Sequence, residues 1–158
     1  MSDAVPGFDP LRIRAQRARE RIYALEMLND APDRAVHVSR GWWEPHRIYH
    51  LRWEKYALAK IGASRVSARR VTAMLASGAV VIDELTVANW WVAVVVESTM
   101  LDLTDSHWVA PPPALALLRG ATEFRSADFG EFSLRETMLA IGALSNAKHL
   151  NTTVMSER

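Results

Sequence analysis

The sequence predicts an all-α fold, an irregular helical domain of about five helices with extended N-terminal and proline-rich arms. Three observations support this prediction. Apolar residues recur at spacings of three and four along several stretches, as they do on the buried face of a helix. Residues typical of helix ends flank these stretches. The most apolar stretch, residues 84–103, is also too long for an ordinary β-strand.

The composition is that of an ordinary globular protein. A chain of 158 residues forms about one domain, here residues 1–158, and can bury a sizeable core. The hydrophobic content is 49%, the charged content is 23%, and the net charge of +1 gives no general reason to expect a polyanionic partner. The absence of cysteine excludes disulfides, thiolate metal ligands and cysteine nucleophiles, and it fits a reducing compartment.

The sequence gives no indication of export or membrane insertion. Its first residues carry no apolar signal segment, and its longest apolar run, Val92 to Val96, is far too short to cross a bilayer. We therefore expect a cytoplasmic protein without a membrane partner.

The first predicted helix is a basic amphipathic helix over residues 9–29. Asp9 can cap it, and Pro10 fits its first position because the missing N–H would be unpaired there. Its surface is predicted to carry one apolar stripe, formed by Leu11, Ala15, Ala18, Ile22 and Leu25. The rest of its surface carries five arginines, Arg12, Arg14, Arg17, Arg19 and Arg21.

Residues 45–103 are predicted to form an aromatic helical core. A second helix is expected over residues 45–61 and a third over residues 67–78, and glycine suits the end of each. Residues 84–103 are ambiguous, because their β-branched residues favour a strand. Their apolar spacing and their length favour a buried helix, which is our prediction.

Residues 111–158 are predicted to form a proline-rich arm and a C-terminal helix. The triple proline at 111–113 bars helix, and a short helix is expected to follow it as far as Arg119. A loop over residues 122–132 carries three expected anchors, Phe124, Phe129 and Phe132. The segment from Ser133 to Glu136 is a capping box that begins the last helix.

His46, His50 and Glu54 are the metal-ligand candidates of the sequence. On a helix their spacing of four would place them on one side, and two histidines so spaced can ligate a metal. The pattern is weak, because a metalloprotease helix reads His-Glu-x-x-His and this segment reads His-Arg-Ile-Tyr-His. We expect no cofactor bound by this chain alone, and we interpret the three residues as an exposed or interfacial face.

Arg65, Arg69 and Arg70 gather at the start of the third predicted helix, where cations oppose the helix dipole. This placement favours a nearby anion, although a solvated basic surface explains it equally well. The same region allows an alternative function, in which residues 54–61 and 66–77 form the helix-turn-helix of a DNA-binding or regulatory protein. Its turn would carry extra residues, so nucleic acid is not the expected partner.

Five of the six tryptophans lie in or beside the aromatic core. They are Trp42, Trp43, Trp53, Trp90 and Trp91. So much rigid apolar surface in one region is typical of a dense core or of a permanent protein–protein contact. We interpret these residues as an interface or pocket that a different protein chain completes.

The residues of this core resemble a known family. His50-x-x-Trp53-Glu54, followed by Tyr56-Ala57-Leu58, is similar to the His-x-x-Trp-Glu and Phe-Ala-Leu segment of nitrile hydratase β-type subunits, thiocyanate hydrolase subunits and nitrile hydratase accessory proteins. The segment Trp-Trp-Val-Ala-Val-Val-Val-Glu at residues 90–97 is similar to the family's Trp-Leu-Ala-x-Leu-Glu helix, with the glutamate displaced by one position. The resemblance is confined to residues 50–97, and residues from Leu103 onward do not match.

The resemblance implies a supporting role. The family's β-type region is helical and wraps around a catalytic subunit that holds cobalt or iron through a cysteine cluster. This cysteine-free chain would then be a non-catalytic subunit or accessory of a nitrile hydratase-like lyase, with the metal in its partner. Arg69 or Arg70 would support the partner's oxidised cysteine ligands, and Trp90 and Trp91 would wall the pocket or interface.

Overall fold

The computed structural model describes residues 9–30, 39–115, 118, 123–130 and 132–145. These residues form a mixed α/β fold, with four helices and a four-stranded antiparallel sheet, so the prediction of an all-α fold is wrong. The helices are α1 (Pro10–Asp30), α3 (Arg70–Ala76), α4 (Trp90–Leu103) and α5 (Leu134–Ser145). The strands are β1 (His46–Trp53), β2 (Leu58–Arg65), β3 (Val80–Val87) and β4 (Phe124–Ser126).

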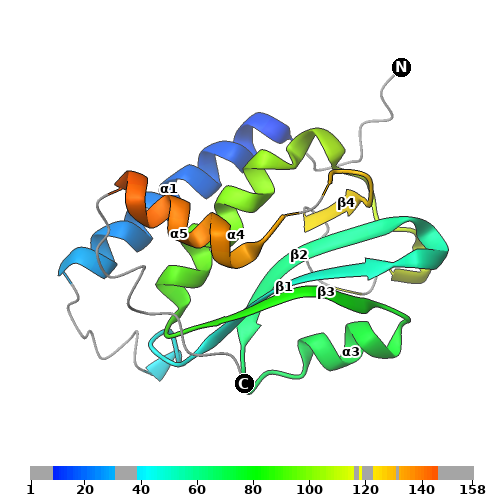
Figure 1. Ribbon diagram of the computed structural model, residues 1–158, viewed down its shortest axis with the longest axis horizontal. Coiled ribbons are helices and arrows are strands. Elements are labelled where there is room, and N and C mark those ends of the chain that lie inside the picture. Colours follow the sequence, from blue (N-terminus) through cyan, green and yellow to red (C-terminus); the bar gives the residue numbers. More distant parts are fainter. Residues whose placement is uncertain (1–8, 31–38, 116–117, 119–122, 131, 146–158) are drawn as a thin grey trace.

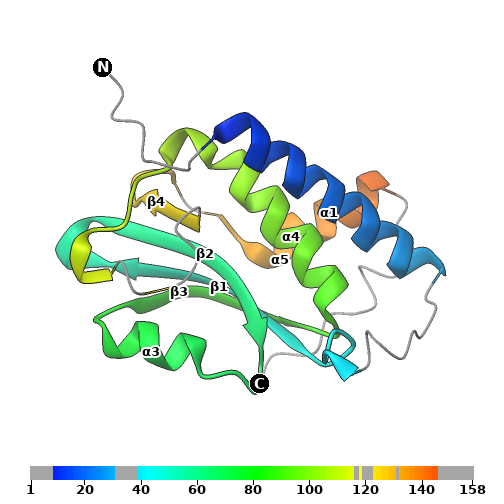
Figure 2. The ribbon, with the colours of Figure 1, turned by 180° about the vertical axis from the view of Figure 1, so that it is seen from behind.

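The elements stack in layers around the sheet, whose strand order is β3-β1-β2-β4. Helices α4 and α5 lie on one face of the sheet, and α1 packs against the outer side of α4 (Figure 1). Helix α3 lies below the other face, as the view from behind also shows (Figure 2). Each face of the sheet therefore has its own apolar core.

The largest correction concerns residues 45–61, which were predicted as a helix and form a β-hairpin instead. Strands β1 and β2 pair in antiparallel register and are joined by the 3-10 turn η1 (Glu54–Tyr56), which Ala57 closes with a φ of 47°. Both faces of β1 are covered, since Ile48 belongs to the core below α4 and Tyr49 to the core above α3. Burial on both faces removes the alternation of apolar and polar residues by which half-buried strands are recognised.

The ambiguous segment 84–103 divides at Asn89. Its first four residues complete β3, and the Asn89 side chain then accepts a hydrogen bond of 3.1 Å from the amide of Val92, which caps α4. Helix α4 is buried on nearly all sides, because it lies between α1 and the sheet. The helix prediction is therefore confirmed for residues 90–103 and wrong for residues 84–87.

Capping residues begin the first and last helices as expected. Asp9 accepts a hydrogen bond from the amide of Leu11, and Ser133 accepts one from the amide of Glu136, each at 3.1 Å. After the triple proline the structure has a 3-10 turn, η3 (Pro113–Leu115), and the rest of the helix expected there lies mostly outside the described residues. In the described ranges no helix has the length and apolar character needed to cross a bilayer.

Candidate functional site

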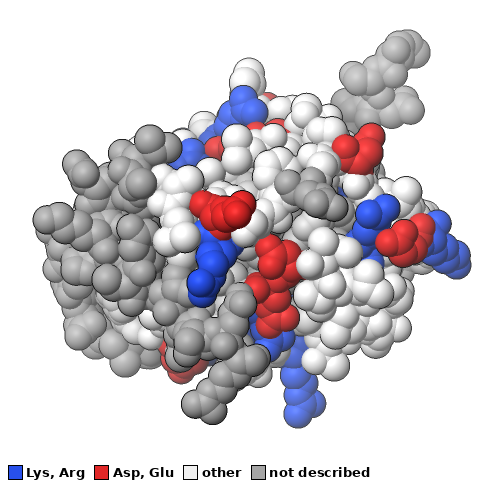
Figure 3. All heavy atoms as spheres, viewed as in Figure 1, with Lys and Arg blue, Asp and Glu red and all other residues white. Residues whose placement is uncertain are grey.

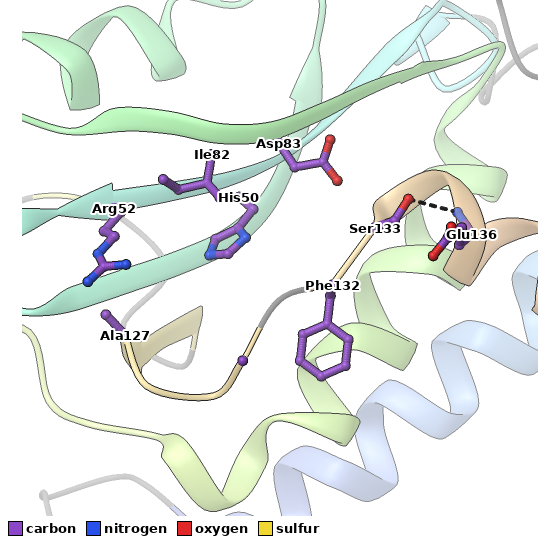
Figure 4. Close-up of a pocket in the computed structure, with 9 residues that line it drawn as sticks. His50, Arg52, Ile82, Asp83, Ala127, Phe132, Ser133 and Glu136 are labelled. Atoms are coloured by element: carbon purple, nitrogen blue, oxygen red, sulfur yellow. Dashed lines mark hydrogen bonds between the residues drawn. The ribbon is translucent and has the colours of Figure 1, made fainter.

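A cavity of about 670 Å³ opens between the sheet, the loop that follows β4 and the beginning of α5 (Figure 4). We call it the His50 pocket. The polar side chains in its lining include His50, Arg52, Asp83, Ser133 and Glu136. Its volume is in the range of small-molecule binding sites, which combine apolar walls with a few polar groups.

His50 is the most enclosed of these polar side chains. Its side chain lies on the α4-facing side of β1, is 6% exposed, and packs on the ring of Phe129 with the ring centroids 5.1 Å apart. Within the described part of the chain, its Nδ1 atom has no hydrogen-bond partner. Burial lowers the pKa of His50, and the charge of Asp83 opposes this effect only in part. The ring is therefore neutral near pH 7 and offers one donor and one acceptor nitrogen.

A β-bulge in β3 shapes the wall opposite His50. His50 pairs with Asp83 and Leu51 pairs with Val81, so Ile82 is the additional residue of the bulge. Bulges of this kind redirect side chains next to functional sites. The Asp83 carboxylate accepts hydrogen bonds of 2.8 Å from the amides of Glu84 and Leu134. Asp83 therefore ties the start of α5 to the sheet and fixes this wall of the pocket.

The charged groups of the pocket lie at opposite ends. Arg52 is two residues from His50 on the same face of β1, and its Nε pairs with the carboxylate of Glu54 at 3.1 Å. Asp83 and Glu136 lie on the other side of His50, next to the first turn of α5 (Figure 4). The cavity therefore has a cationic end and an acidic end, with a neutral imidazole between them.

The three metal-ligand candidates do not converge. His46 and His50 lie four residues apart on a strand, which separates them by about 13 Å, whereas one helical turn would have brought them together. The Nδ1 atom of His46 lies 2.8 Å from the carbonyl oxygen of Glu44, and Glu54 pairs with Arg52. Across the described part of the chain no three His, Asp or Glu side chains are placed to hold a metal ion.

The predicted arginine cluster is divided by the fold. Arg69 precedes α3 and is exposed, whereas Arg70 donates to the carboxylate of Glu123 at 3.3 Å. Lys60, whose side chain is fully buried, donates to the same carboxylate at 2.6 Å. Burial, reinforced by the charge of Glu123, raises the pKa of the neighbouring Glu97 to about 8. Arg70 thus belongs to an internal ionic cluster of this chain.

The DNA-binding alternative lacks the helix pair that it requires. Residues 54–61 form η1 and the first half of β2, so no helix precedes α3 in the way that a helix-turn-helix demands. On the face drawn in Figure 3, basic and acidic side chains are interspersed and neither sign forms a continuous field. That face does not have the electrostatic character of a nucleic-acid interface.

The tryptophans pack largely against one another and against the core of this chain. Trp53 and Trp91 are almost completely buried, so neither can form an outer surface. Trp42 stacks on Trp90 with ring centroids 5.1 Å apart, and Trp43 meets the edge of Trp91 at 5.9 Å. Trp42, Trp43 and Trp90 are partly exposed, and their role in an interface stays a prediction.

A serine, a histidine and an aspartate meet beside the Arg52 end of the pocket. The hydroxyl of Ser126 donates to Asp128 at 2.5 Å, which lowers the pKa of that carboxyl. Nδ1 of His107 lies 3.3 Å from Asp128 and 3.5 Å from Ser126. A catalytic triad needs one ring nitrogen for the serine and the other for the carboxylate. Here both contacts use the same nitrogen, so the cluster does not form a proton relay.

Comparison with known proteins gave no family model, no curated protein and no solved structure that matches this chain. The nitrile hydratase resemblance therefore stays a prediction. The function has to be inferred from the site itself.

Sequence reasoning found His50 but missed its neighbours in the pocket. Arg52 lies in a strand where a helix is predicted, and Asp83 lies between two predicted elements, so their spacing along the chain is uninformative. One usable signal was present, because Ser133 and Glu136 were recognised as a capping box, and polar groups at the start of a helix often line a site.

Proposed function

We propose that this protein is a binding protein that holds a small polar molecule in the His50 pocket. The observation that carries the proposal is Nδ1 of His50, a buried atom of a residue that lines the cavity, which has no hydrogen-bond partner among the described residues. Buried polar atoms are almost always paired, and leaving one unpaired costs about 1–3 kcal/mol. A ligand that hydrogen-bonds to Nδ1 itself would recover this free energy, which gives the unpaired atom a function.

The remaining lining supports the same function. Phe132 and Ile82 supply apolar surface, and Ile82 is half exposed at the rim where the bulge places it. The polar groups come from β1, β3 and the start of α5, so elements distant in sequence converge on one space. Such convergence on a cavity of this size is typical of a ligand site.

Binding can be measured at His50 itself. In a screen of small polar molecules by long-range proton–nitrogen NMR, a ligand of the pocket should shift the ring nitrogens of His50. Those of His46 provide an internal control, because that ring lies outside the pocket and contacts the Glu44 carbonyl. Binders that leave the His50 ring unshifted would contradict the proposal.

The substitution His50→Leu separates ligand binding from a structural role. Because Nδ1 has no partner, an apolar side chain of similar size should leave the free energy of unfolding unchanged or higher. Binding of any ligand found in the screen should be lost. Chemical denaturation and calorimetry measure the two effects. A loss of stability above about 1 kcal/mol would instead assign His50 a structural role.

The supporting role in a nitrile hydratase-like enzyme stays a prediction from the sequence. Arg69 is exposed at the start of α3, so a partner's anionic group can reach it. Co-purification of the full-length chain from its native host tests this role. A cysteine-containing partner that is lost with Arg69→Ala would support it, and recovery of the chain alone would contradict it.

A further inference from the structure

The two ends of the His50 pocket differ in charge, and this difference restricts the ligand. Arg52 is the cation in the lining at one end, with Glu54 and Asp128 beside it outside the lining, while Asp83 and Glu136 carry negative charges in the lining at the other end (Figure 4). A ligand with one charge would satisfy only one end. It would also have to remove the other end from water without compensation, which is unfavourable for a charged group.

The cationic end can receive a carboxylate. Among the described residues, Arg52 forms one ion pair, between its Nε and Glu54, and the two side chains are 39% and 69% exposed. An ion pair this exposed contributes little to stability, so it competes weakly with an incoming anion. The terminal guanidinium nitrogens can form a two-pronged contact with a carboxylate, the geometry that arginine favours. The imidazole of His50 can donate a further hydrogen bond.

The acidic end can receive an ammonium group. The Asp83 carboxylate is held in place by the amides of Glu84 and Leu134, and each of its oxygens keeps a lone pair for another donor. Glu136 lies in the first turn of α5 and is exposed towards the cavity. Two carboxylates on elements that are tied together form a ready site for a cation.

The spacing of the two ends sets the length of the ligand. Arg52 is two residues along β1 from His50, and Asp83 pairs with His50 on the neighbouring strand, so the Cα atoms of Arg52 and Asp83 are roughly 8 Å apart. The guanidinium of Arg52 and the carboxylate of Asp83 point away from each other (Figure 4), so the two charged groups do not approach one another. We infer that the ligand is a zwitterion whose carboxylate and ammonium groups are separated by several bonds, as in an ω-amino acid. An α-amino acid is too short, because both of its charged groups are attached to one carbon. This inference rests on the proposed function of the pocket.

Four probes of similar chain length test the charge pattern by isothermal titration calorimetry of the full-length protein. ε-Aminocaproate carries both charges at its ends, norleucine is its isomer with adjacent charges, and caproate and hexylamine carry one charge each. ε-Aminocaproate should bind at least about tenfold more tightly than each of the others, the difference expected for one additional charge-assisted hydrogen bond.

Two variants test which end of the pocket binds the carboxylate of the ligand and which binds its ammonium group. Arg52→Gln should weaken binding of ε-aminocaproate and caproate but not of hexylamine. Glu136→Gln should weaken binding of ε-aminocaproate and hexylamine but not of caproate. Arg47→Gln and Glu84→Gln are matched controls, because these two residues pair with each other at 2.7 Å on the opposite face of the same strands. Neither control should change any affinity.

The calorimetry tests the zwitterionic ligand separately from the proposed function of the pocket. Equal affinities for ε-aminocaproate and norleucine, or for ε-aminocaproate and caproate, would overturn the zwitterion while leaving a ligand pocket. Absence of binding by all four probes would also overturn it. The proposed function itself depends on the His50 resonances and on His50→Leu, whichever molecule the screen identifies.

Discussion

Buried polar side chains in this protein differ in whether they have partners. The guanidinium of Arg125 is fully buried and donates to Thr104, to the Leu101 carbonyl and to Asp105 at 2.9–3.1 Å. Lys60 is equally buried and bonds to Glu123. Networks with such complete pairing hold elements together. His50 is also buried, but among the described residues its Nδ1 has no hydrogen-bond partner. The buried hydroxyl of Tyr49 is unpaired too, but His50 lines the cavity and Tyr49 does not, which is why we assign His50 to ligand binding.

Glu97 should make stability depend on pH. Because its pKa is raised to about 8 from an ordinary 4.5, the folded state favours the protonated carboxyl. The stability that this shift contributes is fully present below pH 4.5 and is lost as the pH rises through 8. The wild-type protein should therefore lose stability between pH 6.5 and pH 8, above the range in which His46 and His50 change stability, and Glu97→Gln should remove most of that slope. Denaturant unfolding at a series of pH values measures both.

Two histidines provide the opposite trend and serve as a control. Burial lowers the pKa of His46 and His50 below 6.5, so the stability they contribute is present above 6.5 and is lost as the pH falls through their folded-state values. This loss on the acidic side should persist in Glu97→Gln. If that variant kept the full loss of stability towards pH 8, the raised pKa of Glu97 would be wrong.

At the scale of elements, the sequence identified helices better than strands. Capping residues are local signals, and Asp9 and Ser133 located the starts of α1 and α5. The apolar stripe predicted for α1 is wrong, because Leu11 and Ile22 are 79% and 58% exposed and the helix buries Ala24, Met27 and Leu28 instead. Strands β1 and β2 have no comparable signal, because both of their faces are buried and they contain Lys60 and Gly62. Glycine is required at position 62 by a contact between strands and not by its backbone conformation. A Cβ atom there would lie 2.5 Å from the hydroxyl of Tyr49.

The candidate site was predictable only in part, for the same reason. The pairing of His50 with Asp83 depends on a strand register, and the bulge at Ile82 depends on how β3 meets β1. Neither can be inferred from spacing along the chain. The sequence therefore supplied the histidine and the cap of α5 but not the space between them.

The start of α5 should be sensitive to its cap. Ser133 accepts from the Glu136 amide at 3.1 Å, so Ser133→Ala should cost about 1 kcal/mol of stability. Ser133→Asp, which keeps an acceptor, should recover most of this loss. Hydrogen exchange should increase in the first turn of α5 and not in α4, whose own cap is Asn89. Equal exchange in wild type and Ser133→Ala would show that Asp83 alone holds this turn.

At the scale of the whole molecule, the basic first helix has partners within its own chain. Arg17 pairs with Asp102 at 3.1 Å and with Asp105 at 2.8 Å, and Arg21 pairs with Asp102 at 3.0 Å. Asp105 also binds the buried Arg125. These arginines join α1 to the end of α4 and to Asp105 just beyond it, across sequence separations of 81 to 88 residues.

The attachment of α1 should therefore depend on Arg17 more than on any exposed arginine of the same helix. The Arg17 side chain is 7% exposed, and Arg17→Ala would remove one partner from each of Asp102 and Asp105. Asp102 would keep Arg21 and Asp105 would keep Arg125, so the expected cost is about 1–3 kcal/mol. Arg19 is exposed on α1, and Arg19→Ala is the matched control, expected to change stability by less than about 0.5 kcal/mol.

Guanidinium denaturation measures the free energies of unfolding of both variants, and hydrogen exchange should increase along α1 in Arg17→Ala alone. Similar small losses in both variants would mean that apolar contacts, such as those of Ala24 and Met27 with the core below, hold α1 without help from the ion pairs.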